Sequence, residues 1–544
     1  MVLVVVAVRI LASFIIFEDY SLSWSKSSAK TFLLKSVVYI FAFILYMPFY
    51  YQVINFSFMV SELLTYLFIL NFLVYFYYFL INRSGVEKTK TVVIYGAGKA
   101  GVKLEEEFSD NEYKVKYFVD DDKRMQKRSI DGVKVISKKK LKSKIDDDII
   151  YDLLIIAMPS APQKRVKEIY KNLGEYFKEI KILPSLDEIL KEKDFVSQLR
   201  NLSVADLMAR HPKDLDKKAI SEFLKGKVAL ITGAGGSIGS EIARQCVHFG
   251  VQKLVLIDHS EYNLYAIEQE LESFDHVELV PVLQSVVNRE NLEKTFDHYK
   301  PQIVIHAAAY KHVPMVEANI EEGIVNNIFG TKNLIDTAIQ YGVEKCILIS
   351  TDKAVRPTNV MGATKRICEL YAQNSFSQDT DIVAVRFGNV LGSSGSVIPK
   401  FKAQIEKGQN ITVTHPDITR YFMLIPEACE LVLQAGAIGT GGEIFILDMG
   451  KPVKIVDLAQ KMIELSGHDD IEIEFTGLRP GEKLYEELLI DASECSSTKY
   501  ESITVANRTD YNIDKLNQDI EELIQMEDKL GKLKEIIPEF VHRP

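Results

Sequence analysis

The sequence predicts an α/β protein that begins with membrane-spanning helices. Two observations support this fold class. Three long apolar stretches precede residue 82, and farther on two short apolar strands each run into a glycine-rich turn and a helical pattern. We therefore predict transmembrane helices over residues 1–84, a small α/β domain over 85–185, a helical linker over 186–225, a larger α/β domain with a smaller lobe over 226–490 and C-terminal helices over 491–544.

Length and composition narrow the function classes. A chain of 544 residues has room for two or more domains, each with its own core. The net charge of −10 argues against nucleic acid as the main partner. The five cysteines show no Cys-x-x-Cys pair, so we expect no metal site and buried or idle thiols in a reducing compartment.

The apolar stretches are Val2–Phe17, Ser36–Ser61 and Leu63–Ile81. A spanning helix needs about 20 apolar residues, so the second and third fit a helical hairpin and the first is marginal. Buried core helices are the alternative. Lysines lie between the first two stretches and after the third, which places the later domains in the cytoplasm by the positive-inside rule. We expect a multi-pass protein of the inner membrane, in contact with its lipid, with Glu62 near the outer headgroups.

The first glycine-rich turn follows the strand Thr91–Tyr95. Gly96, Gly98 and Gly101 have the spacing Gly-x-Gly-x-x-Gly, and Asp120 ends the next strand. This arrangement is typical of a Rossmann-like dinucleotide fold, in which the acid hydrogen-bonds a ribose. Whether this domain binds a nucleotide or is a structural or oligomerising module stays open.

The second glycine-rich turn follows the strand Lys227–Ile231 and enters a helix. Such a turn lets a pyrophosphate approach the backbone, and the helix N-terminus donates N–H groups to it. Asp258, at the end of the next strand, would bind the adenosine ribose and disfavour a 2′-phosphate, which favours NAD over NADP. The predicted cofactor-binding residues are Gly233, Gly236, Ser237, Ile238, Gly239, Asp258 and, after the strand Ile303–Ile305, the small residues Ala307 and Ala308. Lys311 and His312 come next and either approach an anionic substrate or are solvated.

The candidate chemical centre is Thr351-Asp352-Lys353, directly after the apolar strand Cys346–Ile349. Ligands of open α/β sheets bind at the carboxyl ends of strands. A helix is predicted from near Val360, and Met361 and Lys365 share one of its faces. An alcohol, an acid and an amine that face a lysine suit proton transfer, whereas a capped helix after a strand is the alternative.

Several motifs together carry a resemblance to a known family. They are the Thr-Gly-x-x-Gly-x-Ile-Gly turn, His306–Ala309, Thr351–Lys353, Arg386–Val390 and Arg479–Lys483. The chain resembles extended short-chain dehydrogenases/reductases that act on nucleotide sugars, and within them the large, membrane-anchored UDP-N-acetylglucosamine 4,6-dehydratases of bacterial polysaccharide and glycan synthesis. Met361 stands where the broad superfamily has a tyrosine, as in the large dehydratase branch. That branch has four spans, so we expect one more span before Met1.

The resemblance implies an internal redox reaction with NAD. C4 of the hexose is oxidised, water leaves across C5 and C6, and hydride returns to C6. It implies that Lys353 removes the C5 proton, Asp352 protonates the C6 hydroxyl, Thr351 binds the C4 oxygen and Lys365 holds the nicotinamide ribose. Met361 has no proton to exchange, so the C4 base stays open between Asp352 and an ordered water.

On the substrate side the resemblance implies contacts to a UDP-sugar. Arginine forks pair with phosphate, so Arg479, with Glu482 nearby, is expected at the UDP part and Asn389 near the diphosphate. Arg420 belongs to the same predicted lobe. We also expect the protein to form a homo-oligomer.

Two alternatives to this function stay open. A UDP-N-acetylhexosamine 4-epimerase shares fold and cofactor but needs no acid–amine pair at C5 and C6. A non-catalytic membrane-bound scaffold or nucleotide sensor would bind these ligands without turnover.

Overall fold

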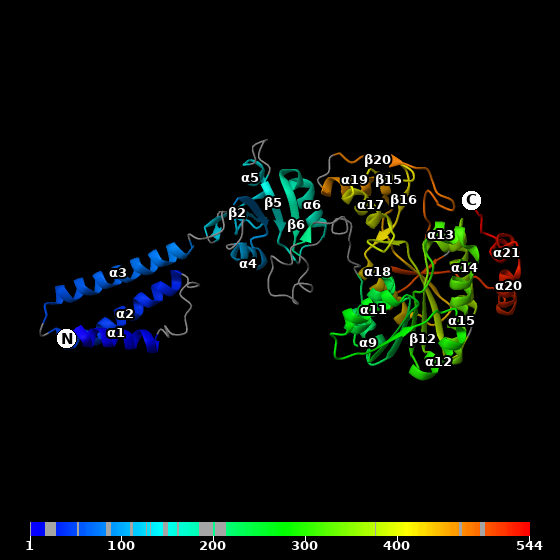
Figure 1. The fold of residues 1–544 in the computed structure, drawn as a ribbon, viewed down its shortest axis with the longest axis horizontal. Coiled ribbons are helices and arrows are strands. Elements are labelled where there is room, and N and C mark those ends of the chain that lie inside the picture. The colour runs from blue at the N-terminus through cyan, green and yellow to red at the C-terminus, as the bar shows by residue number, and fades with distance from the viewer. Residues whose placement is uncertain are drawn as a thin grey trace. The chain divides into compact units, whose positions relative to one another are not determined.

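The structure is a computed structural model that forms two compact units, Met1–Ser160 with Glu175–Arg200, and Ala161–Gly174 with Asn201–Pro544. Figure 1 shows the fold. The residues that the structure describes are 2–16, 29–51, 54–82, 89–108, 113–126, 128–130, 132–144, 151–159, 161, 163–183, 200–201, 214–375, 377–466, 470–489 and 495–543. The predicted linker over 186–225 lies largely outside them, apart from β7 (Arg200–Asn201) and α9 (Lys217–Leu224).

Three helices begin the chain: α1 (Val2–Ile16), α2 (Ala29–Tyr50) and α3 (Phe56–Asn82). Among the described residues, only Phe56–Leu73 is long and apolar enough to cross a membrane, and Ser36–Pro48 is a shorter apolar segment. Three spans were expected, and the described residues support one candidate span. The described part of α1 has only 15 residues with Arg9 at its middle, and α2 contains Lys30, Lys35 and Pro48.

Arg9 of α1 and Glu62 of α3 form an ion pair. Arg9 lies 2.8 Å from Glu62 and donates a hydrogen bond of 2.6 Å to the Tyr46 hydroxyl. Its guanidinium also lies 4.1 Å from the centre of the Tyr66 ring. A charge in apolar surroundings is costly unless it is paired, so this cluster joins α1, α2 and α3. Glu62 thus pairs with Arg9, and because its side chain is half exposed, the expected contact with headgroups stays a prediction.

The first unit contains the predicted Rossmann-like sheet, with the order β3-β4-β2-β1-β5-β6-β7. β1 pairs in parallel with both β2 and β5, as the strand–glycine turn–helix pattern predicts. The new elements of the first unit are β1 (Lys90–Tyr95), α4 (Lys99–Glu107), β2 (Tyr113–Val119), β3 (Ser129–Ile130), β4 (Val133–Ile136), α5 (Lys138–Lys142), β5 (Tyr151–Ile156) and β6 (Phe177–Ile182). Helix α6 (Gln163–Leu173) lies between β5 and β6 in the sequence and is counted with the second unit.

The second unit is built on a nine-stranded sheet, β10-β9-β8-β11-β12-β13-β18-β22-β21. The seven strands from β10 to β18 are parallel. From β8 the chain adds β9 and β10 on one side, and it then returns to add β11 and the later strands on the other side. The order of the strands in the sheet therefore changes direction between β8 and β11. Ligands bind at such a switch point in open α/β sheets. The parallel strands are β8 (Val228–Thr232), β9 (Lys253–Asp258), β10 (Glu278–Leu283), β11 (Ile303–His306), β12 (Lys345–Ile349), β13 (Asp381–Arg386) and β18 (Ile444–Leu447).

Helices cover both faces of this sheet because successive strand residues point to opposite sides. Ala229 and Ile231 pack toward α9, α10, α11 and α18, whereas Leu230 packs toward α12, α15 and α16. The helices are α10 (Ser237–His248), α11 (Glu261–Leu271), α12 (Arg289–Tyr299), α13 (Val313–Ala318), α14 (Ile320–Ile324), α15 (Gly330–Gln340), α16 (Val360–Asn374) and α18 (Ile425–Ile438).

A smaller lobe follows β13 and has its own core around Phe401, Ile411 and Leu458. This is the predicted second lobe of the larger domain. It consists of β14 (Asn389–Val390), α17 (Val397–Glu406), β15 (Ile411–Val413), β16 (Thr419–Arg420), β17 (Phe422–Met423), β19 (Val453–Lys454), α19 (Ile455–Ser466) and β20 (Ile473–Phe475).

The end of the chain differs from the predicted helical segment over 491–544. β21 (Cys495–Ser497) and β22 (Ile503–Ala506) extend the large sheet with antiparallel pairing, and β22 pairs with β18. Only then do α20 (Ile513–Gln525) and α21 (Lys529–Ile536) follow, and both contribute to the core on the α16 face. Strands of three or four residues are too short for alternation to reveal them in the sequence.

We expect Ile520→Ala to destabilise the second unit by about 2–5 kcal/mol, because Ile520 is fully buried in the core that α20 shares with α16. The unfolding midpoint in urea measures this effect. The exposed neighbour Glu521 provides the control, since Glu521→Ala should change stability by less than about 0.5 kcal/mol. Equal midpoints for both variants would mean that α20 is not part of this core.

Candidate active site

A cavity of about 970 Å³ opens between the carboxyl ends of the parallel strands and the smaller lobe. It brings together most of the residues predicted from the sequence. Those on its wall are Gly236, Ser237, Ile238, Gly239, Ala307, Lys311, His312, Thr351, Lys353, Met361, Lys365, Asn389, Arg420, Arg479 and Glu482. Gly233, Asp258, Ala308 and Asp352 are not part of the wall itself.

The glycine turn at the start of α10 leaves no space for side chains. A Cβ on Gly239 would lie 2.1 Å from the Gly233 carbonyl oxygen, and a Cβ on Gly233 would lie 2.7 Å from the Ala308 amide nitrogen. Gly233 also has a φ of 65°, which favours glycine. The backbone of residues 307–308 therefore packs directly against the turn. This cradle fits the pyrophosphate of a dinucleotide at the N-terminus of α10.

Asp258 braces the same turn. One of its carboxylate oxygens accepts a 2.9 Å hydrogen bond from the Gly235 amide, and the other accepts one of 2.9 Å from the Ser260 amide. Each carboxylate oxygen can accept a second hydrogen bond. The carboxylate can therefore still accept a hydrogen bond from a ribose hydroxyl. The contact with the adenosine ribose stays a prediction.

Below the turn lies a buried histidine. His306 bonds to the hydroxyls of Thr232, at 2.7 Å, and Thr331, at 2.9 Å, and so links β8, β11 and α15. Burial lowers the pKa of His306 to about 3, with the Lys365 charge adding to this, so the ring is neutral. Burial also lowers the pKa of Lys365. Met361 and Lys365 both face the cavity, as their spacing on α16 predicts.

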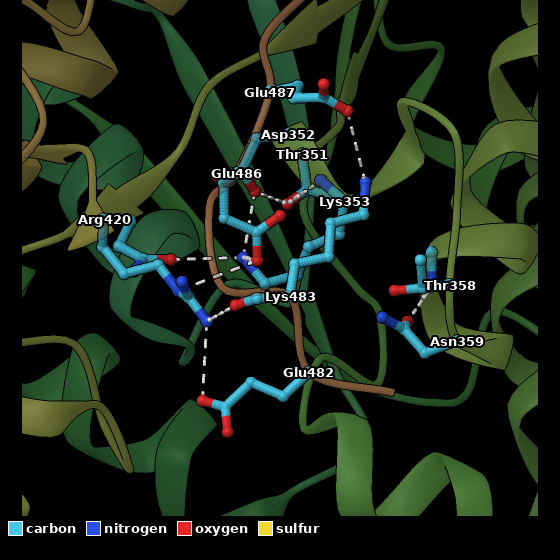
Figure 2. Close-up of polar contacts among 12 residues, drawn as sticks. Thr351, Asp352, Lys353, Thr358, Asn359, Arg420, Glu482, Lys483, Glu486 and Glu487 are labelled. Atoms are coloured by element: carbon cyan, nitrogen blue, oxygen red, sulfur yellow. Dashed lines mark hydrogen bonds and ion pairs between the residues drawn. The ribbon is translucent and has the colours of Figure 1, made fainter. Parts of the chain in front are cut away.

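The Lys353 ammonium is held by oxygens from three segments (Figure 2). It donates hydrogen bonds to Asp352, at 2.9 Å, and to the Asn389 side-chain oxygen, at 3.2 Å. A Glu486 carboxylate oxygen lies 3.6 Å away. The Thr351 hydroxyl donates a 2.9 Å bond to the same Asp352 oxygen. Asn389, expected near a diphosphate, therefore binds the lysine with its acceptor oxygen.

Burial and charge oppose each other at this cluster. Burial lowers the pKa of Lys353, but Asp352 and Glu486 raise it by more, so the net pKa lies above the ordinary lysine value. Burial raises the pKa of Glu486, and although Lys353 lowers it in turn, the net pKa stays above the ordinary value. Asp352 has no exposed surface, whereas the Lys353 side chain is 19% exposed toward the cavity. The amine is therefore the group of this pair that a ligand can reach.

Residues 479–488, which we call the strap, cross the loop that carries Lys353. The side chains of Thr358 and Asn359 each donate a 3.0 Å hydrogen bond to the Gly481 carbonyl oxygen. Lys483 donates one of 2.8 Å to the Val355 carbonyl oxygen, and Arg356 pairs with Glu487. These bonds fix the strap, and with it Glu486, against the loop that carries Lys353.

Arg420 holds the other side of the strap. Its guanidinium donates to the carbonyl oxygens of Lys483, at 2.9 Å, and Leu484, at 3.3 Å, and lies 3.4 Å from Glu482. Although Arg420 reaches the cavity wall, most of its donors are used inside the protein. Its predicted substrate contact stays a prediction, because Arg420 also lines the cavity.

Arg386 is also internal. It forms a paired bond with Glu369, with distances of 3.0 and 2.7 Å, and donates to the Leu488 carbonyl oxygen at 3.1 Å. Burial alone would raise the pKa of Glu369, but Arg386 lowers it by more, and the net pKa is below the ordinary value. The arginine of the Arg386–Val390 motif thus anchors α16 and the strap to the sheet and does not face a ligand.

A cationic subsite on the cavity wall combines residues of the smaller lobe, of the strap and of the loop after β11. Arg479 is exposed at the cavity and makes no ion pair with any described residue. Lys400 lies on the same wall, together with Lys311 and His312. Its ammonium donates a 2.6 Å hydrogen bond to the Thr412 hydroxyl, which offsets part of the cost of its burial. Glu482 accepts a 3.2 Å bond from the Arg479 amide. An arginine and two lysines suit a diphosphate, and Glu482 is the carboxylate beside them.

Two residues of this site had no role in the sequence analysis. Glu486 lies four residues after Glu482, and only the folding of the strap brings it to Lys353. Asn327, in the π-helical turn Val325–Phe329, bonds to both backbone groups of Tyr310 and to the Thr364 hydroxyl. Such π-helical turns occur inside α-helices, often at functional sites. They add no periodic pattern to the sequence by which they could be predicted.

Comparison with known proteins supports this geometry. A family model described as polysaccharide biosynthesis protein matches residues 229–508. A second model, described as C2185-like, N-terminal, matches residues 88–183, which is the Rossmann-like domain of the first unit. The two matches thus cover the two predicted α/β domains separately.

Three curated proteins are similar over long stretches. The capsular polysaccharide biosynthesis protein CapD of Staphylococcus aureus is 50% identical over 76% of this chain and 71% of its own length. The probable polysaccharide biosynthesis protein EpsC of Bacillus subtilis is 48% identical over 68% of this chain and 63% of its own. A UDP-glucose 4-epimerase of Rickettsia rickettsii is 34% identical over 48% of this chain and 77% of its own. The chain therefore spans less than two thirds of EpsC and somewhat more of CapD.

We expect Glu369→Gln to destabilise the second unit by about 3–5 kcal/mol, because it leaves the buried Arg386 charge without its partner. Urea unfolding at neutral pH measures this loss. Glu293→Gln is the control, since its ion pair with Arg289 is exposed and is worth less than about 1 kcal/mol.

The same pair predicts a pH dependence. Because the folded-state pKa of Glu369 lies below its ordinary value of 4.5, the stabilisation is complete above that pH and is lost as the pH falls below it. The stability difference between wild type and Glu369→Gln should therefore shrink in acid. A difference that is constant with pH would contradict the assigned ion pair.

Proposed function

Because the chain belongs to the family of polysaccharide biosynthesis proteins, we propose that it is an NAD-dependent nucleotide-sugar 4,6-dehydratase. Its substrate is UDP-N-acetylglucosamine, and its product is the UDP-4-keto-6-deoxy sugar. One observation carries the proposal: the Lys353 amine, paired with Asp352, lies on the wall of a cavity that has a dinucleotide cradle on one side and a cationic subsite on the other. The names of the CapD and EpsC relatives support a role in surface polysaccharide synthesis.

The residues present fit NAD. The backbone of Gly233, Gly236 and Gly239 would hold the pyrophosphate, and Asp258 would hold the adenosine ribose. Lys365, which is buried and faces the cavity, would hold the nicotinamide ribose. NAD, when bound, supplies the oxidation at C4 of the sugar and the matching reduction at C6.

The substrate would lie along the opposite wall. Arg479 and Lys400 would bind the diphosphate, with Lys311 and His312 closing the same side, and Glu482 would accept hydrogen bonds from the uridine part. This orientation directs the hexose toward Lys353 and Thr351. The Thr351 hydroxyl would bind the C4 oxygen.

Lys353 is the base for the C5 proton. A ketone at C4 makes that proton acidic, and a general base within hydrogen-bond reach typically contributes a factor of about 10²–10⁴ to the rate. Asp352 and Asn389 orient the amine at 2.9 and 3.2 Å. Asp352 was expected to protonate the C6 hydroxyl, but its lack of exposed surface suits it better to holding Lys353. Met361 contacts the cavity without a proton to exchange.

A 4-epimerase is the second candidate, and the Rickettsia relative named UDP-glucose 4-epimerase favours it. An epimerase keeps all atoms of the sugar and needs no base at C5. The lysine next to Asp352 has no task in that reaction, which is why we favour the dehydratase.

The N-terminal helices are proposed as a membrane anchor. One described helix segment, Phe56–Leu73, supports this by length and composition. We further propose that the anchor is in the bacterial inner membrane with the catalytic unit in the cytoplasm, and that the protein is a homo-oligomer.

The detergent-solubilised protein should convert UDP-N-acetylglucosamine to a product lighter by one water, as measured by mass spectrometry. A product of unchanged mass would favour the epimerase, and ligand binding without any product would favour a non-catalytic nucleotide sensor. A product NMR spectrum identifies the 4-keto-6-deoxy sugar.

We expect Lys353→Ala to keep substrate binding but to lose exchange of the C5 proton with solvent deuterium by about 10²-fold or more, because the base is gone. The exposed Lys451 provides the control, and Lys451→Ala should exchange like wild type. Unchanged exchange in the Lys353 variant would remove Lys353 from this role.

We expect Gly239→Ala to abolish NAD binding, because the added Cβ would lie 2.1 Å from the Gly233 oxygen and would distort the turn. Gly98→Ala, in the glycine turn of the first unit, is the matched control, since its Cβ would meet nothing within 4 Å. Fluorescence titration with NADH measures both. Loss of binding in the Gly98 variant alone would place the cofactor in the other domain.

A further inference from the structure

The mechanism above leaves one buried acid of the cavity wall unused. The Glu486 side chain is 4% exposed, and its Oε1 atom lies 3.6 Å from Lys353 Nζ and 3.7 Å from Arg420 Nε. Its Oε2 atom is buried and has no hydrogen-bond partner among the described residues. A buried carboxyl oxygen without a partner is costly, so its retention at this position points to a function.

The proposed role of Lys353 requires a neutral amine, yet its surroundings hold it as an ammonium. The Asp352 carboxylate, 2.9 Å away, is the main reason. A proton acceptor must therefore take one proton from Lys353 before C5 can be deprotonated. The leaving C6 hydroxyl also needs a proton donor that reaches the cavity, and Asp352 has no exposed surface there.

We propose that Glu486 accepts the proton of Lys353 and later donates it to the departing C6 hydroxyl of the sugar. This inference rests on the proposed dehydratase function. It assigns the elimination to two residues from segments that are 133 positions apart in the sequence, Lys353 on the loop after β12 and Glu486 on the strap.

The proton count of the elimination step closes. A proton moves from Lys353 Nζ to Glu486 Oε1 and leaves a neutral amine and a carboxylic acid. The amine then takes the C5 proton, the electrons of the C5–H bond form the C5–C6 double bond, and the C6–O bond breaks. The leaving oxygen takes the proton of Glu486 and departs as water. Lys353 is again an ammonium and Glu486 a carboxylate, as at the start.

The surroundings of Glu486 suit a group that changes its charge. Four charged groups face it: Lys353, Asp352, Arg420 and Lys483. Burial and the Asp352 charge raise the pKa of Glu486 and favour the acid, whereas the three cations lower it and favour the carboxylate. The net pKa lies above the ordinary value, so protonation of Glu486 costs less than that of an exposed carboxylate.

The neighbouring acids of the strap do not have this geometry. Glu482 lies 3.4 Å from Arg420, and Glu487 lies 3.8 Å from Lys483 (Figure 2). Glu487 also pairs with Arg356. Lys353 forms its ion pairs with Asp352 and Glu486 among the described residues. The strap contacts of Lys483 and Arg420 fix Glu486 between them.

The test uses Glu486→Gln in the full-length, detergent-solubilised protein. Binding of UDP-N-acetylglucosamine, measured by calorimetry, should stay as in wild type. At neutral pH, deuterium incorporation at C5 and formation of the dehydrated product should both fall by about 10²–10⁴-fold, because Lys353 keeps its proton. As the pH rises, C5 exchange should recover about tenfold per pH unit, since only the deprotonated fraction of Lys353 reacts. Product formation should stay low at every pH, because the proton donor is missing.

Two further variants make the outcome specific. Glu486→Asp keeps a carboxyl group and should restore the wild-type pH profile in part. Glu521→Gln, at an exposed position of α20, should keep the wild-type pH profile. A Glu486→Gln variant with a wild-type pH profile, or one whose product formation recovers together with C5 exchange, would overturn the inference. A wild type that releases no water would instead overturn the proposed function, and the inference with it.

Discussion

The second unit depends on holding the Lys353 ammonium group, whose side chain is mostly buried, in the cavity wall. Removing an ammonium from water costs several kcal/mol unless oxygens replace its hydration. Here the replacement oxygens come from Asp352 beside it, from Asn389 after β13 and from Glu486 on the strap. The lysine is therefore correctly surrounded only when three segments of the chain have all folded. This requirement couples the reactive group to the packing of the whole second unit.

The end of the chain completes the same arrangement. The Gly481 amide donates a 2.6 Å bond to the Arg543 carbonyl oxygen, and the Arg543 and Val541 amides donate bonds of 3.0 Å to the carbonyl oxygens of Thr358 and Pro357. The loop that carries Lys353 thus lies between the strap and the C-terminal tail. Strands β21 and β22 and helices α20 and α21 bring the tail to this place. The last fifty residues, which show no chemistry in their sequence, contribute to the site by holding its loop.

The two glycine turns of the protein have similar backbone contacts, so the turn by itself does not decide what a domain does. In each, an acid at the end of the second strand accepts a bond from a backbone amide of the turn, Asp120 from Ala97 at 2.8 Å and Asp258 from Gly235 at 2.9 Å. In the second unit, Thr351, Asp352 and Lys353 follow the strand β12 at the same edge of the sheet. The turn provides a place for a dinucleotide, whereas function depends on what the neighbouring strands present to it.

The sequence by itself determined the α/β class, the two glycine turns and the grouping of Thr351–Lys353 with Met361 and Lys365, because these features follow from strand ends and helix spacing over short distances. It did not reveal that Arg386 pairs with Glu369, that Arg420 holds the strap, or that β21 and β22 join the sheet. Those contacts join residues far apart in the chain, and an arginine has the same local pattern whether it faces a phosphate or a buried carboxylate. Only the tertiary structure decided that Glu486 lies beside Lys353, since the path of the strap across the loop that carries this lysine sets that distance.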